Sequence, residues 1–222
     1  MKNLAIVIGG SSGIGRSIIE KLKEDYYVVN MSRSSSDVSG ILNLQTDVCN
    51  TKSIEGSFDF LKEFSSPVLI VYCAGFVEPQ GLLEISNEDW CKTIDTNLNG
   101  AFYCTKQFVK ICDKNDSKIV YISSTAGTRP QAGWSAYSSS KAGLINFALT
   151  MSEELKPYNI KVYCISPGRC ATKLRRKLAP NENQENIMQP SEVANFVYYL
   201  VKSDNVLNGQ NIIVKKDIIG GV

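Results

Sequence analysis

The sequence predicts an α/β fold, a single-domain doubly wound parallel sheet of the Rossmann-like kind with helices on both faces. Short apolar runs alternate with longer amphipathic runs along the chain, as buried parallel strands joined by crossover helices do. A glycine-rich turn follows the first apolar run, and unusual polar residues follow later ones, where a doubly wound sheet presents its ligands. The 222 residues, 43% hydrophobic and 21% charged, suit one globular domain over residues 1–222.

Composition argues against several classes of function. The formal charge of +2 gives no reason to expect a nucleic-acid partner. The chain has no histidine, which excludes Ser-His-Asp and Cys-His catalysis and leads us to expect no metal site. Its seven cysteines form no C-x-x-C pair, so we expect reduced core thiols in a cytoplasmic protein. We see no signal peptide and no apolar run of membrane-spanning length, and therefore expect no membrane partner.

The first apolar run, residues 4–8, leads into a glycine-rich turn with the spacing G-x-x-x-G-x-G and then into an amphipathic helix over residues 16–24. Glycines let the backbone approach a pyrophosphate, and a helix N-terminus presents free N–H groups and the positive end of its dipole. An ordinary strand-to-helix turn is the alternative. The flanking elements favour a dinucleotide-phosphate loop, formed by Gly9, Ser11, Ser12, Gly13, Ile14 and Gly15.

The second strand, residues 27–31, ends at Ser32 and Arg33. In Rossmann folds an acid at this strand end holds the ribose hydroxyls of NAD, whereas an arginine nearby accommodates the phosphate of NADP. Ser32 takes the place of the acid and Arg33 follows it. We therefore expect NADP in preference to NAD, with a solvated surface arginine as the alternative.

The middle of the chain continues the alternation of strands and helices. Asp47 and Val48 follow the third strand, where side chain and backbone could meet an adenine, and Ala74 and Gly75 turn the chain after the fourth. The residues between the second and third strands are too few for a crossover helix. In order we expect a loop, a strand, a helix and a strand at residues 34–40, 41–46, 50–64 and 67–73.

A long helix is predicted from Ser86 to about Cys112. Ser86 suits the N-cap, and Glu88 and Asp89 place negative charge in the first turn. Asn97 lies in the middle of this helix, where asparagine is a poor helix former. Its side chain could bend the helix or hold a water, and the sequence leaves open whether it serves function or is a tolerated defect.

The fifth strand, residues 118–122, ends at Ser123 and Ser124, and a loop then leads to Tyr137. Lys141 stands four residues after Tyr137, so on a helix both side chains share one face. A cation beside a phenol stabilises the phenolate and lowers a tyrosine pKa from its usual value of about 10. Tyr137 is thus a candidate acid or base, although a packed ring beside a solvated amine is the commoner reading of such a pair.

The last third of the chain supplies two further strands and one helix. A loop that contains Pro167, Gly168 and Thr172 follows the sixth strand, and a polar stretch follows it. We expect a strand at residues 160–165, a loop at 166–172, a polar segment at 173–188, a helix at 191–201 and a strand at 209–214.

Together these elements resemble the short-chain dehydrogenase/reductase superfamily over nearly the whole chain. The motifs stand in the family's order and spacing, including a step of thirteen residues from Ser124 to Tyr137. Each motif alone is weak, but the set is specific. It comprises the loop from Gly9 to Gly15, Asp47-Val48, Ala74-Gly75, Asn97, Ser124, Tyr137 with Lys141, and Pro167-Gly168 with Thr172.

The resemblance implies an NADP(H)-dependent oxidoreductase that transfers hydride between nicotinamide and a carbonyl or alcohol substrate. Tyr137 would exchange a proton with the substrate oxygen, and Ser124 would hydrogen-bond that oxygen. Lys141 would lower the pKa of Tyr137 and hold the nicotinamide ribose, and Asn97 would position a water that links Lys141 to solvent. The implied cofactor contacts are completed by Ala74, Gly75, Pro167, Gly168 and Thr172.

Three features depart from the family pattern. Ile8 replaces the usual threonine before the first loop glycine, which removes a hydroxyl that braces the turn. Cys73 replaces the usual asparagine before Ala-Gly, so this loop loses a side-chain anchor. The helix after the second strand is missing or very short. None of the three touches the four implied catalytic residues, so we expect altered stability more than lost activity.

The sequence says little about the substrate. Residues 173–189 take the place of the family's substrate lid, and here that segment is short. A basic cluster could meet a phosphorylated or carboxylated substrate, with a solvated basic turn as the alternative; it comprises Arg169, Arg175, Arg176 and Lys177.

Three functions stay open at this point. One is a 3-oxoacyl-thioester reductase, and another is a reductase of a sugar, polyol or other small polar ketone. The third is a non-catalytic NADP-binding sensor or scaffold, which would have no need of Tyr137. The resemblance also implies a homodimer or homotetramer that pairs through the helices around Asn97 and Tyr137.

Overall fold

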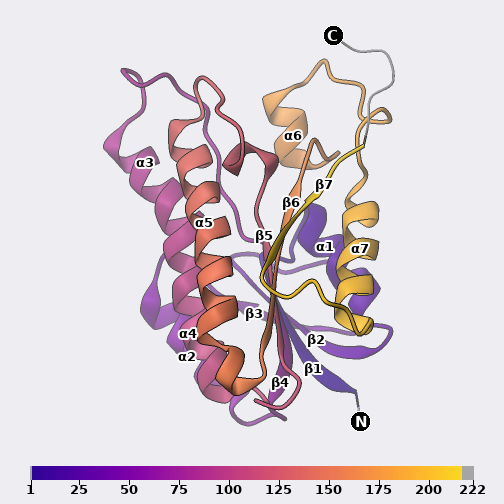
Figure 1. The fold of residues 1–222 in the computed structure, drawn as a ribbon. Coiled ribbons are helices and arrows are strands. Elements are labelled where there is room, and N and C mark those ends of the chain that lie inside the picture. The colour runs from indigo at the N-terminus through magenta and orange to yellow at the C-terminus, as the bar shows by residue number, and fades with distance from the viewer. Residues whose placement is uncertain (1, 217–222) are drawn as a thin grey trace.

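A computed structural model describes residues 2–216, so Met1 and residues 217–222 of the expected domain lie outside the described residues. The described chain forms a sheet whose seven strands are all parallel, in the order β3-β2-β1-β4-β5-β6-β7 (Figure 1). This confirms the predicted doubly wound fold. The strands are β1 (Asn3–Ile8), β2 (Tyr26–Ser32), β3 (Leu42–Gln45), β4 (Pro67–Tyr72), β5 (Lys118–Ile122), β6 (Lys161–Pro167) and β7 (Gln210–Val214).

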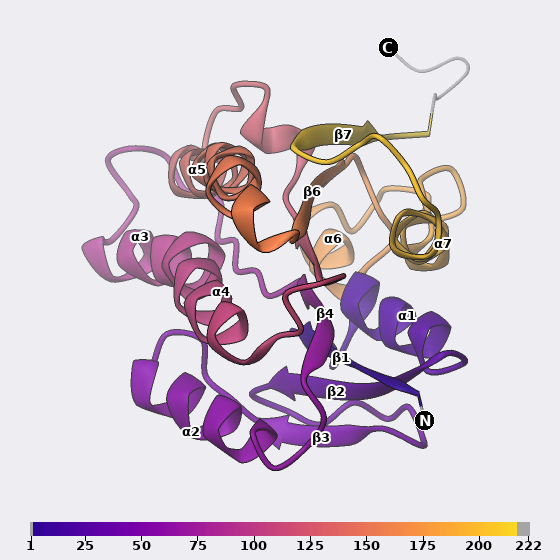
Figure 2. The same ribbon diagram turned by 60° about the horizontal axis from the view of Figure 1, so that its bottom comes forward.

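Helices cover both faces of the sheet (Figures 1 and 2). Alternate residues of β1 show the two cores: Leu4, Ile6 and Ile8 pack in one buried cluster, and Ala5 and Val7 pack in the other. Burial on both faces explains why the central strands are mostly apolar. One face carries α2 (Thr51–Leu61), α4 (Gly100–Ile111) and α5 (Ser135–Glu154), and the other carries α1 (Gly13–Leu22) and α7 (Pro190–Lys202).

The order of the strands reverses between β1 and β4. From β1 the chain adds β2 and β3 on one side, and it then returns to add β4, β5, β6 and β7 on the other side. Doubly wound sheets bind ligands in the crevice that such a reversal opens at the carboxyl ends of the strands. The residues singled out in the sequence follow the ends of these strands or lie on the helical segments after them.

Three helices differ from their predicted extents, and one of them, α2, ends at Leu61, three residues before its predicted end. The first helix, α1, begins at Gly13, three residues before the expected start, because the last two glycines of the loop form its first turn. The predicted long helix is divided into α3 (Asn87–Ile94), a π-helical turn (Asp95–Asn99) and α4. Its predicted N-cap is confirmed, since the Ser86 hydroxyl accepts a hydrogen bond of 3.0 Å from the Asp89 N–H.

The connections hold one α-helix and two 3-10 turns that were not predicted. A short helix, α6 (Lys173–Leu178), opens the stretch expected to be an irregular polar segment, and the Thr172 hydroxyl caps it by accepting from the Arg175 N–H. The segment after β2 holds no helix, as expected. Two 3-10 turns, Thr125–Gly127 and Lys156–Tyr158, flank α5. Across the described residues, no helix has the length and apolar character that crossing a bilayer requires.

Candidate active site

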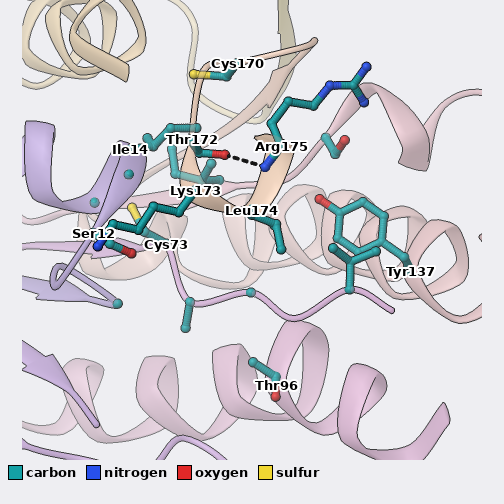
Figure 3. Close-up of a pocket in the computed structure, with 18 of the residues that line it drawn as sticks. Ser12, Ile14, Cys73, Thr96, Tyr137, Cys170, Thr172, Lys173, Leu174 and Arg175 are labelled. Atoms are coloured by element: carbon teal, nitrogen blue, oxygen red, sulfur yellow. Dashed lines mark hydrogen bonds between the residues drawn. The ribbon is translucent and has the colours of Figure 1, made fainter. Parts of the chain in front are cut away.

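A cavity of about 780 Å³ opens at the carboxyl ends of the strands, where the strand order reverses. All of the residues expected to hold a cofactor line it, as do three of the four expected catalytic residues (Figure 3). These three are Ser124, Tyr137 and Lys141, whereas Asn97 is fully buried behind the wall. A volume of this order suits a large organic ligand.

The glycine loop can approach a ligand only because its side chains are absent. Gly9 has a φ of +83°, and a Cβ on it would stand 2.6 Å from the Ala74 nitrogen. A Cβ on Gly15 would stand 2.3 Å from the Gly9 carbonyl oxygen. The chain therefore doubles back so closely here that a non-glycine residue at either position would force the backbone apart.

The N-terminus of α1 opens toward the same cavity without a cap. Within the described chain the Ser12 side chain makes no capping hydrogen bond, and no acid lies in the first turn of α1. By contrast, Asn50, Ser86 and Thr172 cap α2, α3 and α6. Free N–H groups and a positive dipole end suit an anion. The glycine cradle and this uncapped turn fit the pyrophosphate of a dinucleotide.

Asn30 braces the glycine loop, a role not predicted from the sequence. Its Oδ1 accepts from the Gly10 N–H at 3.0 Å, and its Nδ2 donates to Asn43 Oδ1 at 2.8 Å. This fully buried amide holds the turn in place, so the loop is anchored although Ile8 lacks the usual hydroxyl. A polar residue inside the apolar second strand was the signal that could have identified it.

The end of β2 presents a free cation to the cavity. The Ser32 hydroxyl lies against Asn30 Oδ1 and the Ser34 carbonyl, and so faces the protein. Arg33 is exposed, lines the cavity, and forms neither a hydrogen bond nor an ion pair with any residue of the described range 2–216. An unpaired guanidinium at this point fits a phosphate group on the adenosine half of a dinucleotide.

Ser124, Tyr137 and Lys141 meet at the other end of the cavity. The Ser124 oxygen accepts from the Ala126 N–H at 3.1 Å, which leaves its own proton free to donate. The Lys141 ammonium donates to the Ile122 carbonyl at 3.0 Å and lies 5.8 Å from the centre of the Tyr137 ring. Figure 3 shows the Tyr137 hydroxyl directed into the cavity.

Burial shifts the pKa values of both ionisable groups in this trio. Desolvation lowers the pKa of Lys141 from 10.5 to about 8, although the thiols of Cys164 and Cys73 favour its charged form. Desolvation also raises the pKa of Tyr137, and the Ser124 side chain offsets part of that rise. The pKa of Tyr137 therefore lies above its usual value, opposite to the expected net lowering, because loss of solvation dominates the shift.

Asn97 acts on the site through its side-chain amide. Its Oδ1 accepts from the Phe76 N–H at 2.7 Å, and its Nδ2 donates to the Phe76 carbonyl and to the Ser140 oxygen, each at 2.9 Å. Ser140 in turn donates to the Tyr137 carbonyl at 2.7 Å. The amide therefore ties the loop after β4, where Cys73 supplies no amide, to the helix that carries Tyr137.

The contacts that position α5 were also not predicted from the sequence. The Ser123 hydroxyl donates to the Lys141 carbonyl at 2.9 Å. A Cβ on Gly127 would lie 2.7 Å from the Lys141 carbonyl carbon, so the turn after β5 packs directly on the helix backbone. Together these contacts fix the position of the Lys141 backbone relative to the end of β5. The cavity wall includes further residues without an assigned role, among them Cys49, Cys73, Val77, Lys92, Thr96, Gln131, Trp134, Leu174 and Leu178.

Three of the four basic residues near the expected lid are paired. Arg175 forms two hydrogen bonds with the Glu182 carboxylate, at 2.5 and 2.7 Å, and Arg169 adds a third at 3.1 Å. Lys177 pairs with Glu78 at 2.8 Å. Arg176 is exposed and is not among the described residues that line the cavity. Arg169, Arg175 and Lys177 line the cavity, and Arg169 and Lys177 are also solvent-exposed, so the anion site and the solvated basic turn both stay open.

Comparison with known proteins gives a consistent result over most of the chain. The family model described as short chain dehydrogenase matches residues 3–183. A 3-oxoacyl-[acyl-carrier-protein] reductase of Synechocystis is 32% identical over 89% of this chain and 88% of its own length.

Solved structures agree on the fold. The ligand-free aldohexose dehydrogenase of Thermoplasma acidophilum has a TM-score of 0.89 at 26% identity, over 96% of this chain and 92% of that one. An actinorhodin polyketide ketoreductase with NADPH has a TM-score of 0.87 at 26% identity, over 96% and 95% of the two chains.

Proposed function

The chain belongs to the short-chain dehydrogenase family and is an oxidoreductase, and from this premise we propose that it is an NADPH-dependent reductase of 3-oxoacyl thioesters. One observation carries the proposal. A serine hydroxyl, a tyrosine hydroxyl and a buried lysine share a cavity with an uncapped, glycine-rich helix N-terminus. The name of the Synechocystis relative supports the choice of substrate.

The cofactor is held, in this proposal, along the length of the cavity. The first turn of α1 and the glycine loop bind the pyrophosphate, and Arg33 binds the phosphate that distinguishes NADP from NAD. Asp47 and Val48 meet the adenine. The neighbour with bound NADPH supports this choice of dinucleotide. Lys141 and the strand-end loops bind the nicotinamide half, through Ala74, Gly75, Pro167, Gly168 and Thr172.

The chemistry of the residues follows from their protonation states. When bound, the reduced nicotinamide supplies the hydride. Tyr137 donates a proton to the carbonyl oxygen, and its raised pKa keeps the phenol protonated at neutral pH until that step. Ser124 donates its free proton to the same oxygen and stabilises the developing charge.

The other two residues support the proton donor. Lys141, with a pKa of about 8, is mainly an ammonium at neutral pH and stabilises the phenolate that Tyr137 becomes. Asn97 holds the Tyr137 helix through Ser140. Its expected water, which would return the proton from solvent to Lys141, stays a prediction.

Several broader expectations belong to the same proposal. Residues 173–189, opened by α6, act as the substrate lid of a single domain over residues 1–222. The protein works as a homodimer or homotetramer in the cytoplasm, and the free state of the cysteines in the described chain agrees with a reducing compartment. A sugar or other polar ketone is the second candidate substrate, which the name of the aldohexose dehydrogenase neighbour supports.

The test is the consumption of NADPH with acetoacetyl-CoA and, separately, with fructose. We expect steady consumption with the thioester and far less with the ketose. Consumption with the ketose alone would instead select the polar-ketone reductase. Absence of turnover with both would reject both substrates, and cofactor binding without any turnover would favour the non-catalytic NADP-binding module.

A further inference from the structure

Three apolar side chains face the catalytic end of the cavity from opposite sides. Leu174 and Leu178 stand four residues apart on α6, so they share one face of that helix, and Trp134 precedes α5. The Trp134 ring meets the Tyr137 ring edge-on, with centroids 5.5 Å apart. In Figure 3 Leu174 points toward the space in front of the Tyr137 hydroxyl.

This apolar surface is not part of the protein core. Leu174 is 39% exposed, and none of the three side chains belongs to the packed clusters formed by the described residues. A leucine on a lid, beside a catalytic hydroxyl, gains little stability from such a position. Because all three line the cavity that holds Tyr137, they are available to a ligand bound there.

Three of the basic residues around this surface are already paired with carboxylates, whereas Lys173, which also lines the cavity, is exposed. Glu182 engages Arg175 and Arg169, and Glu78 engages Lys177. In Figure 3 the Arg175 guanidinium points away from Tyr137. An anionic group at Arg169, Arg175 or Lys177 would have to displace a carboxylate already in place, whereas a hydrocarbon chain over the two leucines would need to displace only water.

We infer that Trp134, Leu174 and Leu178 form an apolar clamp that selects substrates with an unbranched hydrocarbon chain next to the reacting carbonyl. The inference rests on the proposed reduction at Tyr137. Each methylene that the clamp covers improves binding about fourfold, the factor that corresponds to the transfer of a buried CH₂ from water. A polyhydroxylated substrate gains nothing from the same surface and leaves its hydroxyls without partners.

The test compares 3-oxoacyl-N-acetylcysteamine thioesters with four, six and eight acyl carbons. Binding is followed by Trp134 fluorescence in a Trp90→Phe background with NADP⁺ present, and turnover by NADPH consumption. We expect Kd to fall and kcat/KM to rise by roughly fifteenfold for each two added methylenes. Leu174→Ala and Leu178→Ala should each flatten this slope, because each removes part of the covering surface.

Two control variants separate the clamp from the folding of the lid. Leu174→Met keeps the volume and apolar character of the side chain and should keep the slope. Leu83→Ala removes the same atoms from a leucine that is 94% exposed and lies outside the cavity wall, and it should change nothing.

The outcomes distinguish this inference from the proposed function. If Kd falls with chain length but no thioester is turned over, thioester reduction is rejected and the apolar clamp is retained. Equal Kd values across the series, or a slope that both alanine variants retain, would overturn the clamp. Tighter binding of glucose 6-phosphate than of the longest thioester would also overturn it, since an anionic polar ligand would then occupy the site.

Discussion

Replacing Lys141 by methionine should make the protein more stable while it removes the activity. The pKa of Lys141 falls from 10.5 to about 8 on burial. At about 1.4 kcal/mol per pH unit, the charged side chain is roughly 3 kcal/mol less favourable in the folded chain than in the unfolded one. Loss of the hydrogen bond to the Ile122 carbonyl costs about 1 kcal/mol. We therefore expect a net gain of about 2 kcal/mol in the free energy of unfolding at pH 7.

The pH dependence of the free energy of unfolding tests more sharply whether the buried charge of Lys141 destabilises the fold. Between pH 8 and about 10 the unfolded chain holds a proton on Lys141 that the folded chain has released, so wild-type stability rises with pH in that window. The advantage of Lys141→Met is complete below pH 8 and should shrink by up to about 1.4 kcal/mol per pH unit above it.

The assay is urea unfolding at fixed protein concentration from pH 7 to pH 10, with Lys52→Met as a control at an exposed site on α2. The control should track the wild type throughout. A Lys141→Met variant that is less stable than the wild type by the same amount at every pH would refute the reasoning, because the buried ammonium would then stabilise the fold.

Three further predictions follow from the site. Arg33→Asp should shift preference from NADPH toward NADH, since the unpaired guanidinium is lost and an acid can hold ribose hydroxyls; an unchanged ratio of kcat/KM for the two cofactors would contradict the role of Arg33. Asn30→Ala should lower the free energy of unfolding by about 1–3 kcal/mol and weaken NADPH binding, because the Gly10 N–H and the Asn43 amide lose their buried partner; equilibrium unfolding and fluorescence titration check it, and intact affinity for NADPH would refute the brace. The kcat/KM of carbonyl reduction should be level near pH 7 and fall above about pH 8 as Lys141 loses its charge; a profile that stays level to pH 9.5 would show that the ammonium is not needed.

The parts of this fold that the sequence predicts are those with local signals. Apolar runs mark the strands, and the glycine spacing marks the phosphate loop, because each depends on residues that are neighbours in the chain. The start of α1 at Gly13 was missed because glycine is a poor helix former, and its place there is set by the close approach of Gly15 to Gly9.

The errors arise where distant residues decide the structure. The break in the helix around Asn97 depends on hydrogen bonds to Phe76 and Ser140, which lie 21 and 43 residues away. The direction of the Tyr137 pKa depends on burial, and a Tyr-Lys spacing cannot report burial. The pairing of the basic cluster with Glu182 and Glu78 was not predicted, because these partners are not its helical neighbours.

The most direct test of the account is the Tyr137→Phe variant, measured for both NADPH affinity and turnover of acetoacetyl-CoA. Loss of the proton donor should lower kcat by at least a hundredfold, while the Kd for NADPH stays within a few-fold of the wild type. Turnover that survives this substitution would contradict the assignment of the phenol as the acid that completes hydride transfer.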